Sequence, residues 1–403
     1  MELEAPSIVI TDSTLRDGEQ TPGIAFNLDE KVAIALALEQ AGVDEIEVGI
    51  PAMGDEEVAA IAQVGQALSH ATAMCWGRMT RLDVDAAVRT GLKRVSLSVP
   101  VSDLMIKAKL RGERSLVKSR IREIVPYALD HGLQVAMGGE DSSRGDLDFI
   151  CEVIGEAEKA GVHRFRFADT VGFLDPFRTC TIFQRLRRDT NMALEFHGHD
   201  DLGLATANTL AAVMGGATWA SVCVLGLGER AGNAALEEVA AVLHRVTNFK
   251  TNIIFEKLPA LADLVARASR RAIPPNKPIV GEAVFSHESG IHVDGLLKNA
   301  QTYEALPPSM FGRERQLVLG RHSGRAAILN ALQSLGLPHD DEECIKHVLE
   351  QVRQHAVATK RAVTTDELRE FHVRASAALS DSSSHSGHMQ AKKAAAAAGG
   401  SHS

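Results

Sequence analysis

Long apolar runs are absent from the 403-residue sequence, and none reaches the roughly 18 residues that a membrane-spanning helix needs. A basic excess is also absent, because 43 Lys and Arg stand against 52 Asp and Glu, and no basic stripe is present. Neither a membrane nor a nucleic acid is therefore an expected partner. The acidic N-terminus leads directly into an expected strand, which does not resemble a signal peptide.

Cysteine is scarce, and the five cysteines are widely scattered without CxxC spacing. This usage indicates reduced thiols in a cytoplasmic protein. No obvious Cys/His nucleophile pair is present, and Ser98 and Ser221 both fall inside expected strands. Covalent catalysis therefore has no clear candidate.

Short β-rich runs alternate with longer helical patterns over the first 240 residues. Most of these runs are continuous apolar or β-branched stretches, which is typical of parallel strands buried on both faces. The expected strands are 7–12, 45–50, 72–79, 94–99, 134–139, 163–168, 193–198 and 219–225. Between the first two lies an expected helix over residues 29–41, which Gly42 stops. Eight β units in regular alternation with helices predict an α/β fold, the (β/α)₈ TIM barrel.

A doubly wound open sheet shows the same alternation and stays an alternative at this point. No GxGxxG motif follows the first expected strand, which argues against a dinucleotide-binding sheet. After the eighth unit the composition changes. We expect a catalytic barrel over residues 1–253, and then a linker with a small, mostly helical, lid-like subdomain over 254–377. The Ser-, Ala- and Gly-rich residues 378–403 are expected to be a disordered tail.

Polar and charged residues cluster where the expected strands end, which is where TIM-barrel active sites lie. The strongest signal is the pair His197 and His199. In a strand, residues i and i+2 point to the same side, so both imidazoles can reach one ion. With Asp17 as a third ligand they would form a partial octahedral site with positions open for substrate or water. Capping of loops by hydrogen bonds is the alternative for the two histidines.

Arg16, next to Asp17, suits a site where an oxyanion develops, because a guanidinium is always charged and can hydrogen-bond two oxygens. A structural salt bridge to Glu19 or Glu47 is the alternative interpretation. The Gly-rich residues 226–233 either cradle a phosphate or simply form a tight turn.

Four motifs together resemble the metal-dependent acyl-CoA condensing barrels, the family of 2-isopropylmalate, citramalate and homocitrate synthases. They are residues 14–20 (TLRDGEQ), 197–203 (HGHDDLG), 226–233 (GLGERAGN) and 287–292 (HESGIH). The resemblance covers about residues 7–330. Residues 49–54 and 138–141 look most like the branch of homocitrate synthases found in nitrogen-fixation gene sets, which make homocitrate for the nitrogenase iron–molybdenum cofactor.

The resemblance implies an acyltransferase that condenses acetyl-CoA with 2-oxoglutarate and water to give homocitrate and CoA. It implies a divalent metal ion (Mg²⁺, Mn²⁺ or Zn²⁺) held by Asp17, His197 and His199, with Asn233 as a fourth contact. The implied catalytic residues are Arg16, Glu140, His292 and Tyr303, and the implied acceptor contacts are Gln20, Glu47 and Thr170. In the family the segment that carries His292 often covers a neighbouring subunit's barrel, which implies a homodimer.

Three positions depart from the family pattern. Lysine-pathway relatives place His, Arg and Ser at the positions of Trp76, Ala136 and Gly138, where these groups help to bind the distal carboxylate of 2-oxoglutarate. Arg78 is our hypothesis for a substitute, because it follows Trp76 by two residues on the same expected strand face. A sister synthase that uses pyruvate, 2-oxoisovalerate or another 2-oxo acid stays an alternative, as does a metal-dependent aldolase or lyase without CoA.

Overall fold

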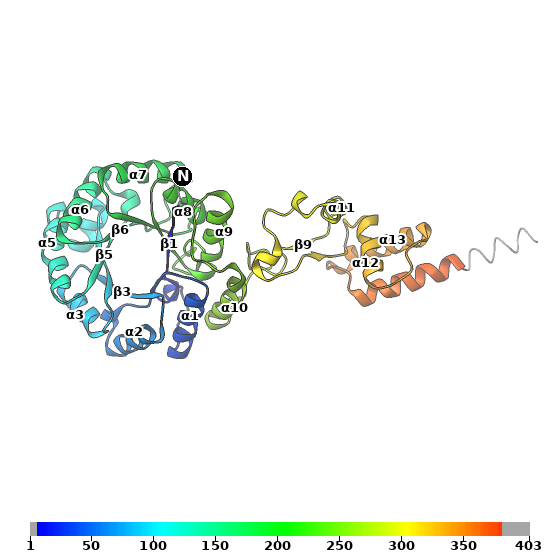
Figure 1. The fold of residues 1–403 in the computed structure, drawn as a ribbon, viewed down its shortest axis with the longest axis horizontal. Helices are drawn as coiled ribbons and strands as arrows, with labels where there is room; N and C mark the ends of the chain where they lie inside the picture. The colour runs from blue at the N-terminus through cyan, green and yellow to red at the C-terminus, as the bar shows by residue number, and fades with distance from the viewer. Residues whose placement is uncertain (1–5, 381–403) are drawn as a thin grey trace, which may run out of the picture. The chain divides into compact units, whose positions relative to one another are not determined.

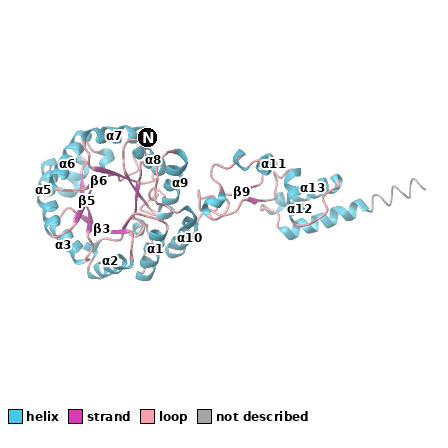
Figure 2. Cartoon of the chain, in the orientation of Figure 1, coloured by secondary structure: helices cyan, strands magenta, loops and turns pink. Residues whose placement is uncertain are grey.

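The computed structural model describes residues 6–380, in two compact units that divide between Val284 and Phe285. The first unit is a closed barrel of eight parallel strands in chain order, surrounded by helices (Figures 1 and 2). Its strands are β1 (Val9–Asp12), β2 (Glu45–Glu47), β3 (Thr72–Arg78), β4 (Arg94–Pro100), β5 (Gln134–Glu140), β6 (Arg164–Asp169), β7 (Ala193–Gly198) and β8 (Trp219–Val222). The expected TIM barrel is confirmed, and pairing of β1 with β8 excludes the open sheet.

The helices of this unit follow the strands in regular order (Figure 2). They are α1 (Leu28–Gln40), α2 (Asp55–Ala67), α3 (Arg81–Arg89), α4 (Asp103–Met105), α5 (Arg114–Asp130), α6 (Leu147–Ala160), α7 (Pro176–Asp189), α8 (Ala205–Met214), α9 (Leu236–Val246) and α10 (Leu258–Ser269). Helix α1 begins at a capping box formed by Asn27 and Glu30. It ends before Gly42, whose φ of +83° and close approach to the Asn252 carbonyl leave no room for a side chain.

The barrel wall has an apolar outside and a charged inside, as β6 shows. Phe165 and Phe167 alternate along this strand with Arg164 and Arg166, and all four side chains are buried. Phe167 packs against Phe183 of α7, so the phenylalanines point outward and the arginines point into the barrel.

Inside the barrel, the arginines pair with glutamates from other strands. Arg164 lies 2.6 Å from Glu45 and 2.8 Å from Glu195, and Arg166 lies 2.8 Å from Glu195 and 3.0 Å from Glu47. Charges buried this deeply persist only when they are paired, because desolvation of each ion is costly. The pairs therefore fix inward residues of three strands, β2, β6 and β7, in one arrangement.

The first unit extends beyond the expected boundary at residues 253/254. Helix α10 packs against α1, and Ile254 donates its backbone N–H to Ala41. Further on, Lys277 lies 2.5 Å from Glu238 of α9. These contacts tie residues 254–284 to the barrel, which is why the structure divides the chain later than the composition suggests.

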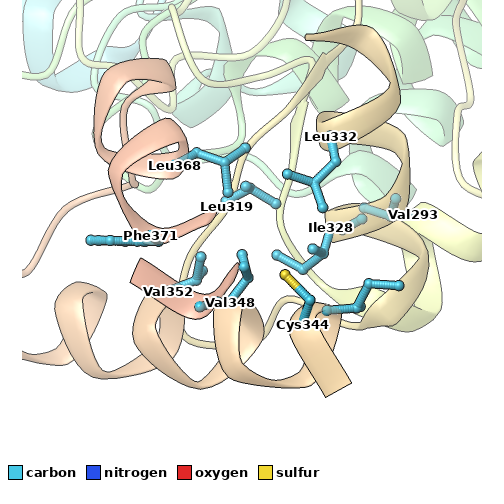
Figure 3. Close-up of a cluster of buried hydrophobic side chains, with 12 residues drawn as sticks. Val293, Leu319, Ile328, Leu332, Cys344, Val348, Val352, Leu368 and Phe371 are labelled. Atoms are coloured by element: carbon cyan, nitrogen blue, oxygen red, sulfur yellow. The ribbon is translucent and has the colours of Figure 1, made fainter. Parts of the chain in front are cut away.

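The second unit is a small helical domain with its own core (Figure 3). Its elements are β9 (Ser286–His287), α11 (Gly290–Lys298), β10 (Gln316–Leu317), α12 (Arg325–Ser334), α13 (Glu342–Thr359) and a helix over 365–380. Ile328, Leu332, Val348 and Phe371 meet in this core. Residues 378–380, expected in the tail, continue the last helix, whereas 381–403 lie outside the described residues. Between residues 6 and 380, no helix is long and apolar enough to cross a membrane.

Candidate metal centre and active site

Asp17, His197 and His199 form a buried cluster at the carboxyl ends of the strands. Asp17 lies in the loop after β1, His197 lies on β7 and His199 directly follows it. Oδ2 of Asp17 is 3.1 Å from Nε2 of His197 and 3.9 Å from Nε2 of His199. One ligand atom from each residue lies within 4.8 Å of the other two, which is close enough for all three to bind one ion.

The orientation of the two imidazoles follows from the strand. Only Gly198 separates them, and their rings meet edge to face with centroids 5.1 Å apart. Nδ1 of His197 hydrogen-bonds Oγ of Ser221 on β8 at 3.1 Å, which leaves Nε2 facing Asp17. A hydrogen bond on the far ring nitrogen is the usual way in which proteins orient a metal-binding histidine.

One further buried atom fits a metal site. Oδ1 of Asn233 has no hydrogen-bond partner among the described residues. The backbone of Asn233 pairs with that of His199, and its Nδ2 donates to the Leu227 carbonyl at 2.8 Å, so only its oxygen is left over. Two imidazoles, a carboxylate and an amide oxygen form a donor set that suits Mg²⁺, Mn²⁺ or Zn²⁺.

The protonation states also fit a bound cation. Burial opposes ionisation of Asp17, but the neighbouring Arg16, His197 and His199 outweigh it and hold the pKa of Asp17 far below its usual range. Burial and the proximity of His197 lower the pKa of His199 to about 4. At neutral pH the cluster therefore offers a carboxylate and a neutral imidazole, the forms that bind metal.

Arg16 is fixed beside this cluster by Glu47. Its Nε donates to Oε2 of Glu47 at 2.7 Å, and its Nη1 lies 3.4 Å from Oδ2 of Asp17. Glu19, the other expected partner, pairs with Lys31 instead. Burial alone would raise the pKa of Glu47, but the guanidinium groups of Arg16 and Arg166 lower it from 4.5 to about 2. The salt bridge therefore positions Arg16 without removing it from the site.

A cavity of about 270 Å³ opens over the cluster. Seven of the expected site residues line it: Arg16, Asp17, Gln20, Glu140, Thr170, His197 and His199. Glu47 lies behind Arg16, and Asn233 lies beside His199. The seven lining residues thus come from the ends of four strands, β1, β5, β6 and β7.

The structure does not bring Arg78, the expected contact to the distal carboxylate, to this cavity. Its side chain is 66% exposed, and it donates to Asp83 from Nε at 3.0 Å and from Nη2 at 2.8 Å. Asp83 is available because Thr80 begins helix α3 directly after the strand. The guanidinium turns back to this carboxylate, so the hypothesis that Arg78 binds the acceptor is wrong for this structure.

His292 and Tyr303 belong to the second unit, whereas Glu140 belongs to the first. The rings of His292 and Tyr303 stack with centroids 4.1 Å apart, so the structure brings these two together. Their expected cooperation with Glu140 stays a prediction. Glu140 itself lies 2.5 Å from Nζ of Lys109.

The cavity wall also contains Ser98, Lys109 and Arg166, which were not among the site residues expected from the sequence. A signal for Arg166 was present, because an arginine at alternate positions of a buried strand must point into the barrel. No comparable signal marks Lys109, which lies in the irregular helical segment 106–110 after β4.

An eight-stranded barrel with a buried Asp-His-His cluster at its strand ends defines a class of TIM-barrel proteins built to hold a divalent ion. Residues 7–265 match the family model described as HMGL-like, and residues 279–360 match the model described as homocitrate synthase post-HMGL domain-like. The chain therefore belongs to the HMGL-like family, within the acyltransferases that condense 2-oxo acids with acyl-CoA.

The relatives carry different synthase names. The chain is 46% identical over 361 residues to homocitrate synthase 1 of Nostoc sp., covering 90% of this chain and 96% of the relative. It is 44% identical over 361 residues to 2-isopropylmalate synthase 2 of Caldanaerobacter subterraneus, covering 90% and 94%. The crystal structure of Bacillus subtilis HMG-CoA lyase matches with a TM-score of 0.59 at 19% identity, covering 68% of this chain and 97% of the lyase. At this low identity, the match to the lyase shows only that the two proteins share a fold.

Proposed function

We propose that the protein is a homocitrate synthase, which condenses acetyl-CoA with 2-oxoglutarate and hydrolyses the thioester to release homocitrate and CoA. The observation that carries the proposal is the match of residues 279–360 to the post-HMGL domain of homocitrate synthases. The similarity to the Nostoc homocitrate synthase supports it. Its product would supply the homocitrate of the nitrogenase iron–molybdenum cofactor, as the resemblance to the nitrogen-fixation branch implies.

At the metal end of the cavity, Asp17, His197 and His199 would hold the divalent ion, with Asn233 as a further ligand. When bound, the ion supplies a Lewis acid and a template for the keto oxygen and adjacent carboxylate of the acceptor. Arg16 stabilises the alkoxide that forms when the acetyl carbon attacks the ketone. Because Glu47 already fixes the guanidinium, little reorganisation is needed as the charge develops.

The cavity wall offers further contacts to the acceptor. Thr170 accepts a hydrogen bond from the backbone N–H of Asp141 at 2.9 Å, so its own hydroxyl proton is free to donate to a substrate carboxylate. Gln20 lines the same cavity and provides an amide of both donor and acceptor character. These residues orient the acceptor next to Arg16.

Removal of a proton from the acetyl methyl group requires a positioned base, because this group is a weak acid. We assign this step to His292, assisted by Tyr303, which stacks on it, and by Glu140 at the cavity. The assignment requires the second unit to reach a barrel, in the same chain or in the partner of a homodimer. Light scattering of the purified protein tests the homodimer.

A sister synthase that uses another 2-oxo acid is the second candidate, and the similarity to the Caldanaerobacter 2-isopropylmalate synthase supports it. Release of CoA thiol from acetyl-CoA with 2-oxoglutarate, pyruvate and 2-oxoisovalerate separates the candidates. Release with 2-oxoglutarate alone supports homocitrate synthesis. Release with pyruvate or 2-oxoisovalerate supports the sister synthase, and no release with any acceptor supports an aldolase or lyase without CoA.

A further inference from the structure

We infer that Arg166 binds the second carboxylate of a dicarboxylic 2-oxo acid, in a recess that Arg166 forms with Ser98 and Gly138. The inference rests on the proposed function, because only an acceptor with a second carboxylate requires such a group. It replaces Arg78, whose guanidinium is held by Asp83 away from the cavity.

The first observation is an unused hydrogen-bond donor. Arg166 is 3% exposed and lines the cavity. Its Nε donates to Glu195 at 2.8 Å and its Nη1 donates to Glu47 at 3.0 Å. Its Nη2 is buried and has no partner among residues 6–380. A buried guanidinium nitrogen without a partner is costly, and an anionic ligand in the cavity would remove that cost.

The second observation is the space beside that donor. Ser98, Gly138 and Arg166 are register partners on the neighbouring strands β4, β5 and β6, and all three line the cavity. Gly138 has no side chain, and the nearest atoms to a Cβ built there all belong to Ser98, with Oγ at 3.4 Å. These three residues form a row in which the Ser98 hydroxyl and the Arg166 guanidinium flank the space above Gly138.

The third observation is the placement of the two arginines at the cavity. Glu47 bonds Nε of Arg16 through Oε2 and Nη1 of Arg166 through Oε1, so one carboxylate sets both guanidinium groups. Arg16 faces Asp17 at the metal end. Arg166 stands in the row with Ser98 and Gly138, where it can receive the far end of an acceptor whose keto group lies at the metal.

The test compares Michaelis constants for the two substrates in Gly138→Val and Arg166→Lys. Valine fills the recess without removing or adding a charge, and lysine keeps the charge but loses Nη2. We expect both variants to raise KM for 2-oxoglutarate about 10- to 100-fold, as loss of one charged hydrogen bond does. KM for acetyl-CoA should change less than about twofold. Arg78→Ala is the matched control, and we expect it to leave both constants unchanged.

Thermal unfolding verifies that each variant is folded. If Arg166→Lys does not fold, Gly138→Val alone tests whether the recess binds the second carboxylate. Equal rises in both Michaelis constants would overturn the inference, as would an effect specific to 2-oxoglutarate in Lys109→Met but not in Gly138→Val. If the unmodified protein releases no CoA with 2-oxoglutarate, the proposed function itself fails. If it does release CoA and Gly138→Val has no selective effect, only the role of Arg166 fails.

Discussion

Nε2 of His197 lies 3.1 Å from Oδ2 of Asp17, although Asp17 follows the first strand and His197 belongs to the seventh. The contact exists because β8 pairs with both β1 and β7 and so closes the barrel between them. Barrel closure and metal binding are therefore linked, because the ligand set is assembled only when the last strand is in place.

Replacement of His199 by Ala tests the ligand set directly. We expect His199→Ala to weaken binding of Mn²⁺ or Zn²⁺ by more than ~100-fold, because loss of a ligand should exceed the 10- to 100-fold effect of losing an outer partner. Isothermal titration of the chelator-stripped protein measures this without any turnover. His163→Ala, at an exposed histidine just before β6, is the control. Equal affinity in the two variants would contradict the metal centre.

Ser221 is expected to act on the metal through His197, whose Nδ1 it hydrogen-bonds. Ser221→Ala should lower metal affinity by roughly 10- to 100-fold, because the imidazole loses the partner that orients it. Ser221→Thr keeps the hydroxyl and should retain most of the affinity. The same titration checks both variants. If Ser221→Thr lost as much metal affinity as Ser221→Ala, the effect would be one of packing rather than of the hydrogen bond.

Arg16 is expected to act on kcat rather than on acceptor binding. Arg16→Lys keeps a positive charge but loses the fork that Glu47 positions, so the alkoxide is poorly stabilised. We expect kcat for CoA release to fall by about 10²- to 10³-fold, the usual effect of losing one such donor. A rise in KM for 2-oxoglutarate at unchanged kcat would show that Arg16 only binds substrate.

Glu47 should make stability sensitive to acid. Its pKa is lowered from 4.5 to about 2, so its contribution is fully present above pH 4.5 and is lost as the pH falls towards 2. The shift corresponds to about 3 kcal/mol. Glu47→Gln should therefore be less stable than the unmodified protein at pH 7, and the difference should narrow below pH 4.5. Urea unfolding at pH 7 and pH 3 measures this, and a constant difference would contradict it.

The core of the second unit provides a test that is independent of catalysis. Phe371 is 4% exposed and packs in the core of Figure 3, whereas Val373 on the same helix is 66% exposed. Phe371→Ala should lower the free energy of unfolding of this unit by about 3–5 kcal/mol, because it leaves a cavity. Val373→Ala should change it by less than ~0.5 kcal/mol. Denaturant unfolding followed by circular dichroism compares the two.

All eight strands could be predicted from the sequence, because a parallel strand buried on both faces is a short, nearly continuous apolar run. The exact ends of the strands could not all be predicted. The second strand stops at Glu47 rather than at residue 50, because Gly49 takes a φ of +153° and Pro51 begins a short helical turn. These turns depend on local backbone geometry, which the apolar pattern does not describe.

The metal cluster could be predicted because the HxH spacing fixes the side of the strand, and barrel closure brings the strand ends together. The residues that would bind the far end of the acceptor could not be predicted. Alternation places Arg78 on a face, but whether its guanidinium reaches the cavity depends on Asp83 of the next helix. The orientation of Arg166 in turn depends on Glu47 and Glu195, which come from distant strands. These two residues leave Nη2 of Arg166 without a partner among residues 6–380.

The most direct test of the proposed function supplies acetyl-CoA with a trideuterated methyl group, together with 2-oxoglutarate and a divalent ion, and identifies the products by mass spectrometry. We expect CoA and an equal amount of homocitrate that carries two deuterium atoms, because enolisation removes one. We expect neither product after chelation of the metal. Homocitrate that forms equally well without metal, or the absence of homocitrate with all components present, would contradict the proposed function.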